Sequence, residues 1–593
     1  MKIPKTEVFY IIFAKISVLD YNFRDLVKAS KSIDLKDDAK NLRIALLGDH
    51  STQFFNHSTA AAVKISGFNP DIFEADYDQI DLTIFDPTSE FNKVENDYVI
   101  IWESSLKLLQ KYWGTDIPTR ASFAAEQIQN IQNRIDAIKE SQPKAKILVF
   151  NLEIVDADSF GTYSDKLNHS LKSIIYEINH AIHKMASIQD SVYHLDVNML
   201  GLQAGKIRNN VQYINSDLHY DLDFFAHVSQ YIANFIRSQE ALFKKCLILD
   251  LDNTTWGGVI GDDGMENIQI GSLGIGKAFT NLQKWAKELK NRGIILAVCS
   301  KNTESIAKEP FEKHSDMVLR LEDISVFVAN WENKADNIRY IQEVLNISFD
   351  SMVFLDDNPL EREIVSQEIP EICVPELPED PVDYLPYLWS LNLFETSSFS
   401  KNDSDRTKQY QEEAKRKALG KKSTNVQDYL KSLEMVAQVN SFDETDVPRI
   451  AQLTQRSNQF NLRTIRYTEE DIKKIINSDN YLTYSVKLSD KFGSYGLISL
   501  VILEKSGDSS FFIDTWIMSC RVLKRDVEKM LINRIVDDLN KLSIERLDGE
   551  RIPTKKNIIV KDLLKDLSFS ELEVGKFELF LSNFTPHKHY INE

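Results

Sequence analysis

Short apolar runs that end abruptly in polar residues recur from residue 42 to residue 357, and longer stretches with helical spacing separate them. Such runs are typical of buried parallel strands, and their alternation with helices predicts a doubly wound α/β fold. In the first part of the chain we expect strands at 42–47, 98–102, 146–150 and 191–195, and helices at 121–140 and 166–188. We assign these elements to a domain spanning 1–240. Ligands of such sheets bind beyond the carboxyl ends of the strands.

The rest of the chain predicts two further domains. The stretch 241–395 contains expected strands at 246–252, 293–300 and 351–357, each ending in polar residues. The polar, lysine-rich stretch 396–425 indicates a linker with a solvated helix at 405–418. In 426–593 we expect strands at 484–488, 496–503 and 511–516, followed by a helix at 526–542. This last pattern favours an α+β domain, so the predicted fold class is an α/β multidomain protein.

Composition excludes several classes of protein. The 593 residues are too many for a single core, and 43% hydrophobic with 27% charged residues is typical of folded domains. Lys and Arg number 70 against 89 Asp and Glu, and the net charge of −19 argues against binding to nucleic acid or an anionic membrane. The 4 cysteines lack the spacing of a zinc or disulfide framework. The apolar run 8–14 is broken by Lys15 and is too short to span a bilayer, so we expect a cytoplasmic protein.

Carboxylates cluster at the strand ends of the middle domain. Asp250 and Asp252 follow one expected strand, and the pair Asp356-Asp357 follows another. Crowded carboxylates are costly unless a cation neutralises them, and hard oxygen ligands of this kind favour Mg²⁺. Between the two pairs come Ser300, at the end of a third strand, and Lys334, just before a helix.

This ordered set resembles the haloacid dehalogenase (HAD) superfamily of phosphotransferases. The resemblance implies that Asp250 is a nucleophile that forms an aspartyl phosphate and that Asp252 is the general acid and base. It also implies that Ser300 and Lys334 hold phosphoryl oxygens. The implied Mg²⁺ ligands are Asp250, the backbone carbonyl of Asp252, and Asp356 with or without Asp357. Phosphoryl transfer requires these functions: an in-line nucleophile, neutralised charge and a proton donor.

A narrower resemblance runs from about residue 246 to residue 530. Its motifs are Trp256 to Gly264, Val298 to Asn302, Ala329 to Lys334 and Phe354 to Arg362. They closely resemble FkbH-like proteins of the capless subfamily IIIC, which implies a Rossmann-like core. Family members take an acyl phosphate, hold the glyceryl group as a cysteine thioester and pass it to an acyl carrier protein. The resemblance makes Cys299 the candidate thiol, since it adjoins Ser300.

Two residue patterns leave alternatives open. Side chains alternate along a strand, so Cys299 should face away if Ser300 faces the phosphate, and free cysteines are often buried packing residues. A turn beginning at Cys299 would remove this objection. The segment Asp262-Asp263-Gly264 is either a second metal site or a turn, and Asp-Gly pairs are common in turns.

The C-terminal domain resembles GNAT-type acyltransferases. These enzymes bind the pyrophosphate of an acyl-thioester cofactor with backbone amides of an RxxGxG/A loop at a helix N-terminus. The corresponding cofactor-binding residues are Arg521, Lys524 and Arg525, but Lys524 and Asp526 replace the two glycines. Their side chains obstruct close approach of an anion, and Asp526 adds negative charge. We expect recognition of a carrier-linked pantetheine or another acceptor. Cys520 belongs to the same motif, either as an acyl site or as a packed thiol.

The N-terminal domain vaguely resembles SGNH hydrolases, which also have a flavodoxin-like α/β fold. Their Gly-Asp-Ser nucleophile and DxxH pair correspond to Gly48-Asp49-His50-Ser51, with the serine one place late, and Asp217-Leu218-His219, one residue short. Either change misplaces a triad whose members must be in hydrogen-bond contact. We therefore expect a substrate-positioning or partner-binding domain.

The expected protein is a three-domain, Mg²⁺-dependent enzyme with an open phosphotransferase core. It would remove phosphate from a small acyl phosphate and pass the acyl group to a carrier protein or other acceptor. Two alternatives remain: a plain phosphomonoesterase acting on a sugar or nucleotide phosphate in a biosynthetic pathway, and a non-catalytic scaffold that binds a carrier or glycan.

Overall fold

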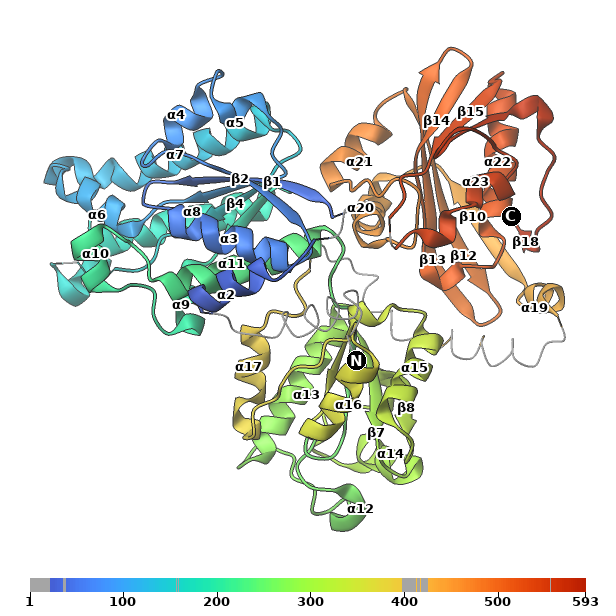
Figure 1. Ribbon diagram of the computed structural model, residues 1–593, viewed down its shortest axis with the longest axis horizontal. Coiled ribbons are helices and arrows are strands. Elements are labelled where there is room, and N and C mark those ends of the chain that lie inside the picture. Colours follow the sequence, from blue (N-terminus) through green and yellow to red (C-terminus); the bar gives the residue numbers. More distant parts are fainter. Residues whose placement is uncertain are drawn as a thin grey trace. The chain divides into compact units, whose positions relative to one another are not determined.

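The computed structural model in Figure 1 describes residues 22–35, 39–155, 157, 159–396, 412, 416, 425–554 and 556–593. The apolar run 8–14 and most of the predicted linker 396–425 lie outside the described residues. The chain divides into two compact units, and among the described residues the boundary between them along the chain falls between Ile236 and Arg237. The predicted boundaries at 240, 395 and 425 stay predictions.

The first unit is built on a parallel sheet with the strand order β2-β1-β3-β4-β5. Its strands are β1 (Asn41–Gly48), β2 (Asn69–Glu74), β3 (Tyr98–Trp102), β4 (Lys146–Phe150) and β5 (Val192–Leu195). Helices α7 (Arg120–Ser141) and α8 (Leu171–Ile188) cover one face. Helices α3 (Gln53–Ile65) and α11 (Leu222–Gln239) contribute aromatic rings to the other. Strands covered on both faces are apolar throughout, and the four predicted ones are confirmed.

Two elements of this unit differ from prediction. Strand β2 was missed because it contains Pro70 and is only half buried, as is common at a sheet edge. The helix predicted at 166–188 begins only at Leu171, because the Ser170 hydroxyl accepts a hydrogen bond from the Ser173 backbone and caps it. Residues before it form a short 3₁₀ helix, Gly161–Lys166.

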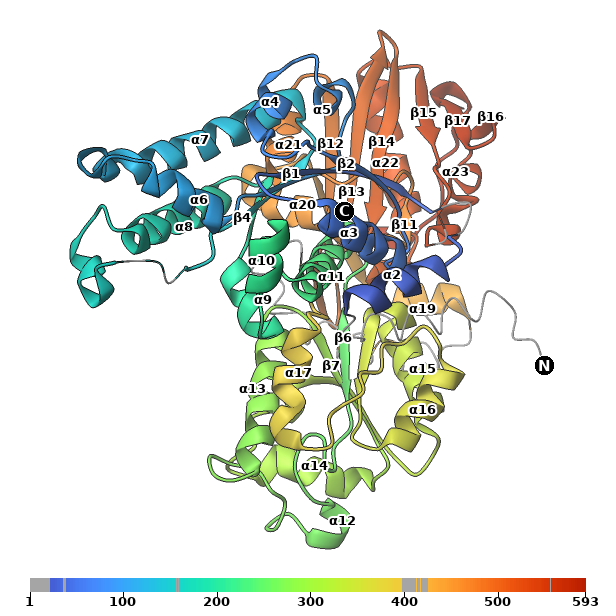
Figure 2. The same ribbon diagram turned by 60° about the vertical axis from the view of Figure 1, so that its left-hand side comes forward.

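The middle part of the chain forms a second parallel sheet with the order β8-β7-β6-β9. The strands are β6 (Cys246–Leu249), β7 (Ile295–Ser300), β8 (Ile324–Ala329) and β9 (Met352–Leu355). Figures 1 and 2 both show α13 (Gly276–Asn291) and α17 (Tyr384–Ser390) on one side of these strands. Helices α15 (Lys334–Leu345) and α16 (Pro359–Glu368) lie on the other side. The three predicted strands are confirmed but are shorter, so their acidic residues stand just beyond the strand ends.

The C-terminal part forms a mixed sheet with the order β16-β17-β15-β14-β13-β12-β10-β18. Its strands are β10 (Met435–Asn440), β12 (Tyr481–Asp490), β13 (Gly493–Gly507), β14 (Ser510–Met518), β15 (Arg546–Glu550), β16 (Ser570–Glu573), β17 (Lys576–Phe580) and β18 (Ile591–Asn592). Helix α22 (Val527–Lys541) packs on one face. Helices α20 (Val447–Arg456) and α21 (Glu469–Ile476) pack on the other. A short strand, β11 (Phe460–Asn461), pairs with the end of β14.

Two parallel α/β sheets and one mixed sheet confirm the predicted α/β multidomain fold class. Further helices are α2 (Phe23–Lys31), α4 (Ile80–Phe85), α5 (Glu90–Lys93), α6 (Ser105–Trp113), α9 (Val197–Ala204), α10 (Asn210–Ser216), α12 (Ile260–Asp263), α14 (Glu304–Lys313), α19 (Val426–Ser432) and α23 (Leu563–Asp566). Among the described helices, none has the length and apolarity needed to cross a membrane.

Candidate active site

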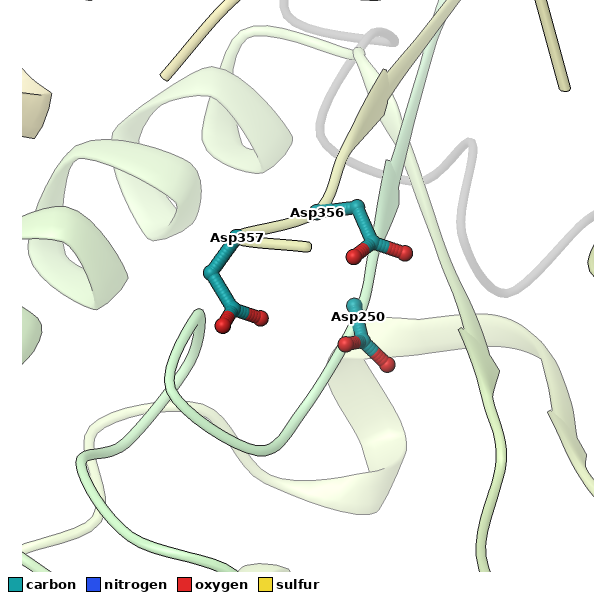
Figure 3. A group of neighbouring side chains, drawn as sticks. All are labelled: Asp250, Asp356 and Asp357. Atoms are coloured by element: carbon teal, nitrogen blue, oxygen red, sulfur yellow. The ribbon is translucent and has the colours of Figure 1, made fainter. Parts of the chain in front are cut away.

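Three aspartates meet at the carboxyl edge of the middle sheet. Strands β6 and β9 are neighbours with Leu249 opposite Leu355, so the residues that follow them are also adjacent. A backbone hydrogen bond of 2.9 Å from Asp250 N to Leu355 O continues the pairing past the strand ends. Carboxylate oxygens of Asp250, Asp356 and Asp357 lie within 4.8 Å of one another (Figure 3). We call these three residues the acidic cluster.

The acidic cluster fits a hard divalent cation. Asp250 and Asp356 are 5% and 0% exposed, so water screens their repulsion poorly. The Asp250 Oδ1 atom is buried and has no hydrogen-bond partner among the described residues. A buried carboxylate oxygen without a donor is costly, whereas three convergent carboxylates suit Mg²⁺. Asp250, Asp356 and Asp357 therefore form a cluster of suitable Mg²⁺ ligands at the predicted place.

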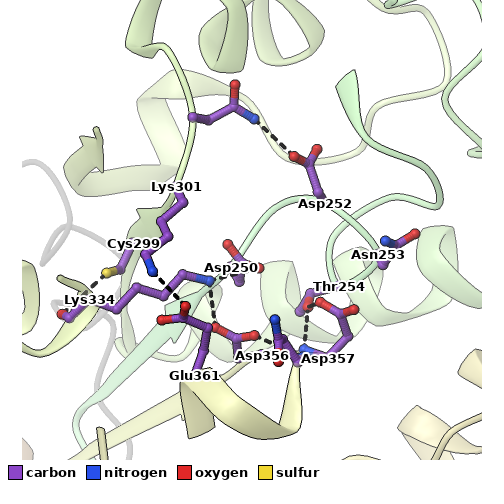
Figure 4. Close-up of polar contacts among 12 residues, drawn as sticks. Asp250, Asp252, Asn253, Thr254, Cys299, Lys301, Lys334, Asp356, Asp357 and Glu361 are labelled. Atoms are coloured by element: carbon purple, nitrogen blue, oxygen red, sulfur yellow. Dashed lines mark hydrogen bonds and ion pairs between the residues drawn. The ribbon is translucent and has the colours of Figure 1, made fainter. Parts of the chain in front are cut away.

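Lys334 supplies positive charge to the same carboxylates. Its Nζ lies 3.1 Å from Asp250 Oδ2 and 2.6 Å from Asp356 Oδ2 (Figure 4). Burial alone would lower the pKa of Lys334, but the neighbouring Asp250 and Asp356 outweigh it and raise this pKa. Asn333 caps α15 by accepting a hydrogen bond from Ala335 N, which fixes the backbone at Lys334.

Burial raises the pKa values of the acidic cluster. For Asp250 burial is the main cause, opposed by Lys334. For Asp356 burial and the charge of Asp250 raise the pKa to about 6. Asp357 is held by Thr254, whose hydroxyl donates to Asp357 Oδ1 at 3.2 Å and accepts from Asp357 N at 2.9 Å. The carboxylates thus occupy fixed places at the sheet edge before any ligand arrives.

Ser300 and Cys299 lie on opposite sides of β7. Ser300 is buried, and its hydroxyl acts on the Asp250 carboxylate, where it opposes the rise in pKa that burial causes. Cys299 instead packs among apolar side chains between the sheet and α15, and its thiol donates to Lys334 O at 3.7 Å. Burial raises the pKa of the Cys299 thiol well above its usual range. This geometry follows the strand alternation and favours a packed thiol over a nucleophile.

Asp252 has its carboxylate outside the acidic cluster. Its two oxygens accept hydrogen bonds from Trp256, Ile260 and Asn302. The prediction assigns only the backbone carbonyl of Asp252 to the metal, and this assignment stays a prediction. Asp263 Oδ2 accepts a hydrogen bond of 2.8 Å from the N–H of Val259, the residue that precedes the short helix α12. Among the described residues, no metal-binding group includes Asp262 or Asp263. The turn interpretation of that segment is favoured.

The predicted cofactor-binding residues of the C-terminal part have different surroundings. Arg521 donates to the Ser519 hydroxyl at 3.2 Å, Lys524 is exposed, and Arg525 is buried with its guanidinium 5.3 Å from the centre of the Tyr495 ring. Lys524 and Asp526, at the two glycine positions of the acyltransferase loop, have φ values of +63° and +61°. This left-handed backbone conformation favours glycine over residues with a side chain. The Cys520 side chain lies outside the described part of the structure.

In the first unit, His219 contacts a serine that the sequence analysis missed. His219 Nδ1 lies 2.6 Å from Ser104 Oγ, and its Nε2 lies 3.2 Å from Asp217 Oδ1. Ser104 follows β3, not the Gly48-Asp49-His50-Ser51 segment, and belongs to no hydrolase motif. Its side chain is 0% exposed and caps α6. Among the described hydrogen bonds, His219 therefore contacts a helix-capping serine, and none joins it to Ser51.

Comparison with known proteins identifies relatives of two parts of the chain. Residues 43–237 match the family model described as FkbH, N-terminal domain. A solved structure described as the N-terminal part of a Bacteroides fragilis protein, containing a phosphatase domain and complexed with Mg, has 44% identity and a TM-score of 0.60. That match covers 64% of this chain and 100% of the solved one. Comparison with curated proteins gave no match.

The C-terminal part matches acetyltransferase structures at low identity. A spermidine/spermine N-acetyltransferase from Vibrio cholerae has 17% identity and a TM-score of 0.20, covering 25% of this chain and 94% of that one. A ribosomal-protein-S18-alanine N-acetyltransferase from Escherichia coli has 16% identity and a TM-score of 0.19. That match covers 24% of this chain and 89% of the solved one.

The Bacteroides structure is matched over its whole length at 44% identity, and the first domain carries the FkbH signature. This chain therefore belongs to the FkbH-like family of phosphatase-domain proteins.

Proposed function

We propose that the middle part of the chain is a Mg²⁺-dependent phosphatase or phosphotransferase that acts through an aspartyl phosphate on Asp250. The observation that carries this proposal is the buried acidic cluster with Lys334 bridging Asp250 and Asp356. Buried carboxylates beside one lysine suit a phosphoryl dianion and a cation, since each ligand neutralises the other. Asp250, Asp356 and Asp357 would hold Mg²⁺, which supplies positive charge to the phosphoryl group when bound.

The protein's own residues supply the remaining chemistry. A carboxylate oxygen of Asp250 forms a bond to phosphorus while the bond from phosphorus to the leaving oxygen breaks, and Asp252 gives that oxygen a proton. Water then attacks phosphorus, its proton passes to Asp252, and the bond between Asp250 and phosphorus breaks. Ser300 and Lys334 hold phosphoryl oxygens, consistent with their contacts to Asp250.

Two substrate classes are in question. The family resemblance supports a small acyl phosphate, with an acyl carrier protein as the acceptor of the acyl group. The packing of Cys299 favours the second class, a plain phosphomonoester. A thiol that is buried between the sheet and α15 and donates to the Lys334 carbonyl is poorly placed to hold a thioester. Hydrolysis of either substrate can use the Asp250 chemistry. Transfer of the acyl group instead requires a thiol to attack the acyl carbon, so that the bond from carbon to the phosphate oxygen breaks and phosphate leaves.

The proposal is tested by measuring phosphate release in Mg²⁺ from a panel of acyl phosphates and sugar phosphates, with intact-protein mass spectrometry of the same samples. We expect phosphate release from at least one panel member. A stable acyl adduct on the protein would identify the transferase, and release without an adduct would identify the phosphatase. Binding without any release would contradict an enzymatic function and support a scaffold.

Replacing Cys299 tests the thioester directly. Because the thiol is packed, we expect Cys299→Ala to lower the free energy of unfolding by about 1 kcal/mol and to leave phosphate release within about threefold of wild type. Cys246→Ala is the matched control, since Cys246 is equally buried in the same cluster. An acyl adduct present in wild type and in the control but lost in Cys299→Ala would contradict this expectation. Its loss in Cys520→Ala would instead assign the acyl group to the C-terminal part.

A further inference from the structure

The Asp252 carboxylate is held by donors on both oxygens. Its Oδ1 accepts from Trp256 Nε1 at 2.9 Å and from Ile260 N at 3.1 Å. Its Oδ2 accepts from Asn302 Nδ2 at 3.0 Å. Figure 4 shows Asp252 apart from Asp250, Asp356 and Asp357, with a dashed bond to its own partner. The side chain therefore has an orientation of its own, independent of the acidic cluster.

The two side-chain donors are themselves fixed. The Trp256 ring is 0% exposed and packs edge-on against Phe311, with ring centres 6.0 Å apart. Asn302 is buried, and its Oδ1 accepts a hydrogen bond from Thr303 N at 2.9 Å. Because the backbone N–H occupies the amide oxygen, the Asn302 NH₂ group must face Asp252. Neither donor can turn away without breaking a buried contact.

We infer that Trp256 and Asn302 are positioning residues that aim Asp252 Oδ2 at the leaving group. Two donors already occupy Oδ1, whereas Oδ2 has a single donor and keeps a lone pair for a proton. This inference rests on the proposed function, in which Asp252 is the general acid and base. It adds two residues from separate loops, Trp256 after β6 and Asn302 after β7, to which the proposed mechanism gives no role.

The clamp formed by Trp256, Ile260 N and Asn302 suits both proton transfers. In the first step the O–H bond at Asp252 Oδ2 breaks as the bond from phosphorus to the leaving oxygen breaks, and the proton moves to that oxygen. The electron pair left on Asp252 is stabilised by the clamp donors. In the second step the Oδ2 lone pair takes a proton from water as the water oxygen bonds to phosphorus. A misaimed carboxylate would slow both transfers.

A merely structural role for the clamp makes a different prediction. A less stable fold would slow the reaction of every substrate to the same extent. A wrongly oriented Asp252 would slow the reaction most when the leaving oxygen is strongly basic. Phenyl phosphate and 4-nitrophenyl phosphate differ in this respect, since phenolate is the stronger base and needs the proton more. The ratio of their rates therefore reports on proton donation and not on folding.

The experiment measures first-turnover release of phenol and of 4-nitrophenol in Mg²⁺ by wild type, Asn302→Ala, Trp256→Phe and Asn267→Ala. The last variant is the control, because Asn267 is an exposed asparagine whose side-chain amide donates to the backbone carbonyl of Asp263 in α12. We expect Asn302→Ala to slow phenyl phosphate at least about tenfold more than 4-nitrophenyl phosphate, with KM within about twofold. Trp256→Phe should shift the ratio in the same direction, and the control should leave it unchanged.

Equal slowing of both substrates in Asn302→Ala, or in Trp256→Phe if the first variant does not fold, would overturn the inference. The thermal unfolding of each variant shows whether a slower rate comes from unfolding or from a changed orientation of the Asp252 carboxylate. If wild type released product from neither substrate, the result would instead count against the proposed function. Failure of the inference and failure of the proposed function are therefore distinguishable.

Discussion

Asp250→Asn is expected to abolish phosphate release, with a loss of roughly 10⁴-fold or more, while the fold remains intact. The amide is nearly isosteric with the carboxylate but cannot attack phosphorus. Lys334 keeps Asp356 as a partner at 2.6 Å, so the substitution does not leave the buried ammonium group without a counter-charge. Mg²⁺-dependent phosphate release and the melting temperature of wild type and variant provide the measurement.

The control for this substitution is Asp262→Asn, which makes the same chemical change at an exposed residue of the short helix α12. We expect it to retain wild-type rates. Asp250→Asn activity within about tenfold of wild type would exclude the aspartyl phosphate, because no other nucleophile could replace Asp250 at so small a cost.

Removal of the metal is expected to have an effect of similar size. Excess EDTA should eliminate turnover, and Mg²⁺ added beyond the chelator should restore it, because the buried acidic cluster repels an anionic substrate unless a cation neutralises it. The measurement is phosphate release before and after chelation, with Ca²⁺ as a second ion of equal charge and larger size. Full turnover in excess EDTA would contradict the assignment of Asp250 and Asp356 as metal ligands.

The pKa of Asp356 makes the metal-free protein sensitive to pH. Burial and the charge of Asp250 raise this pKa from its ordinary value of 3.8 to about 6. A carboxyl group with a raised folded-state pKa stabilises the fold at low pH, and that contribution is lost as pH rises through about 6. In EDTA the melting temperature should therefore fall between about pH 4 and about pH 6, the interval between the ordinary and the raised pKa, more in wild type than in Asp356→Asn. If the melting temperatures of wild type and Asp356→Asn varied with pH in the same way, the raised pKa of Asp356 would be contradicted.

Much of the site could be predicted because its residues directly follow apolar strands. Asp250, Ser300 and Asp356 follow or end β6, β7 and β9, and the parallel pairing of these strands brings their ends to one edge. The same alternation along β7 predicts that Cys299 faces away from Ser300, as it does. Strand ends carry this information because a buried parallel strand is a continuous apolar run with a sharp boundary.

Contacts between loops could not be predicted in the same way. The hydrogen bond from Asn302 to Asp252 joins residues 50 positions apart, and the contact between His219 and Ser104 joins residues 115 apart. Each depends on a turn that follows its strand, and such turns have no periodic pattern in the sequence. The edge strand β2 and the positive φ values at Lys524 and Asp526 were missed for a related reason, since Pro, Lys and Asp at these positions argue locally for other structures.

The position of Lys334 has a consequence for the order in which ligands bind. In the protein alone its ammonium group is shared between Asp250 and Asp356, the same carboxylates that a cation requires. An incoming phosphoryl group offers Lys334 a new partner and draws it from the carboxylates, while the cation replaces the charge that they lose. Each ligand thereby favours the other, and thermodynamic linkage makes this coupling reciprocal. Mg²⁺ affinity should rise in the presence of a phosphate analogue by the same factor by which Mg²⁺ raises the affinity for the analogue.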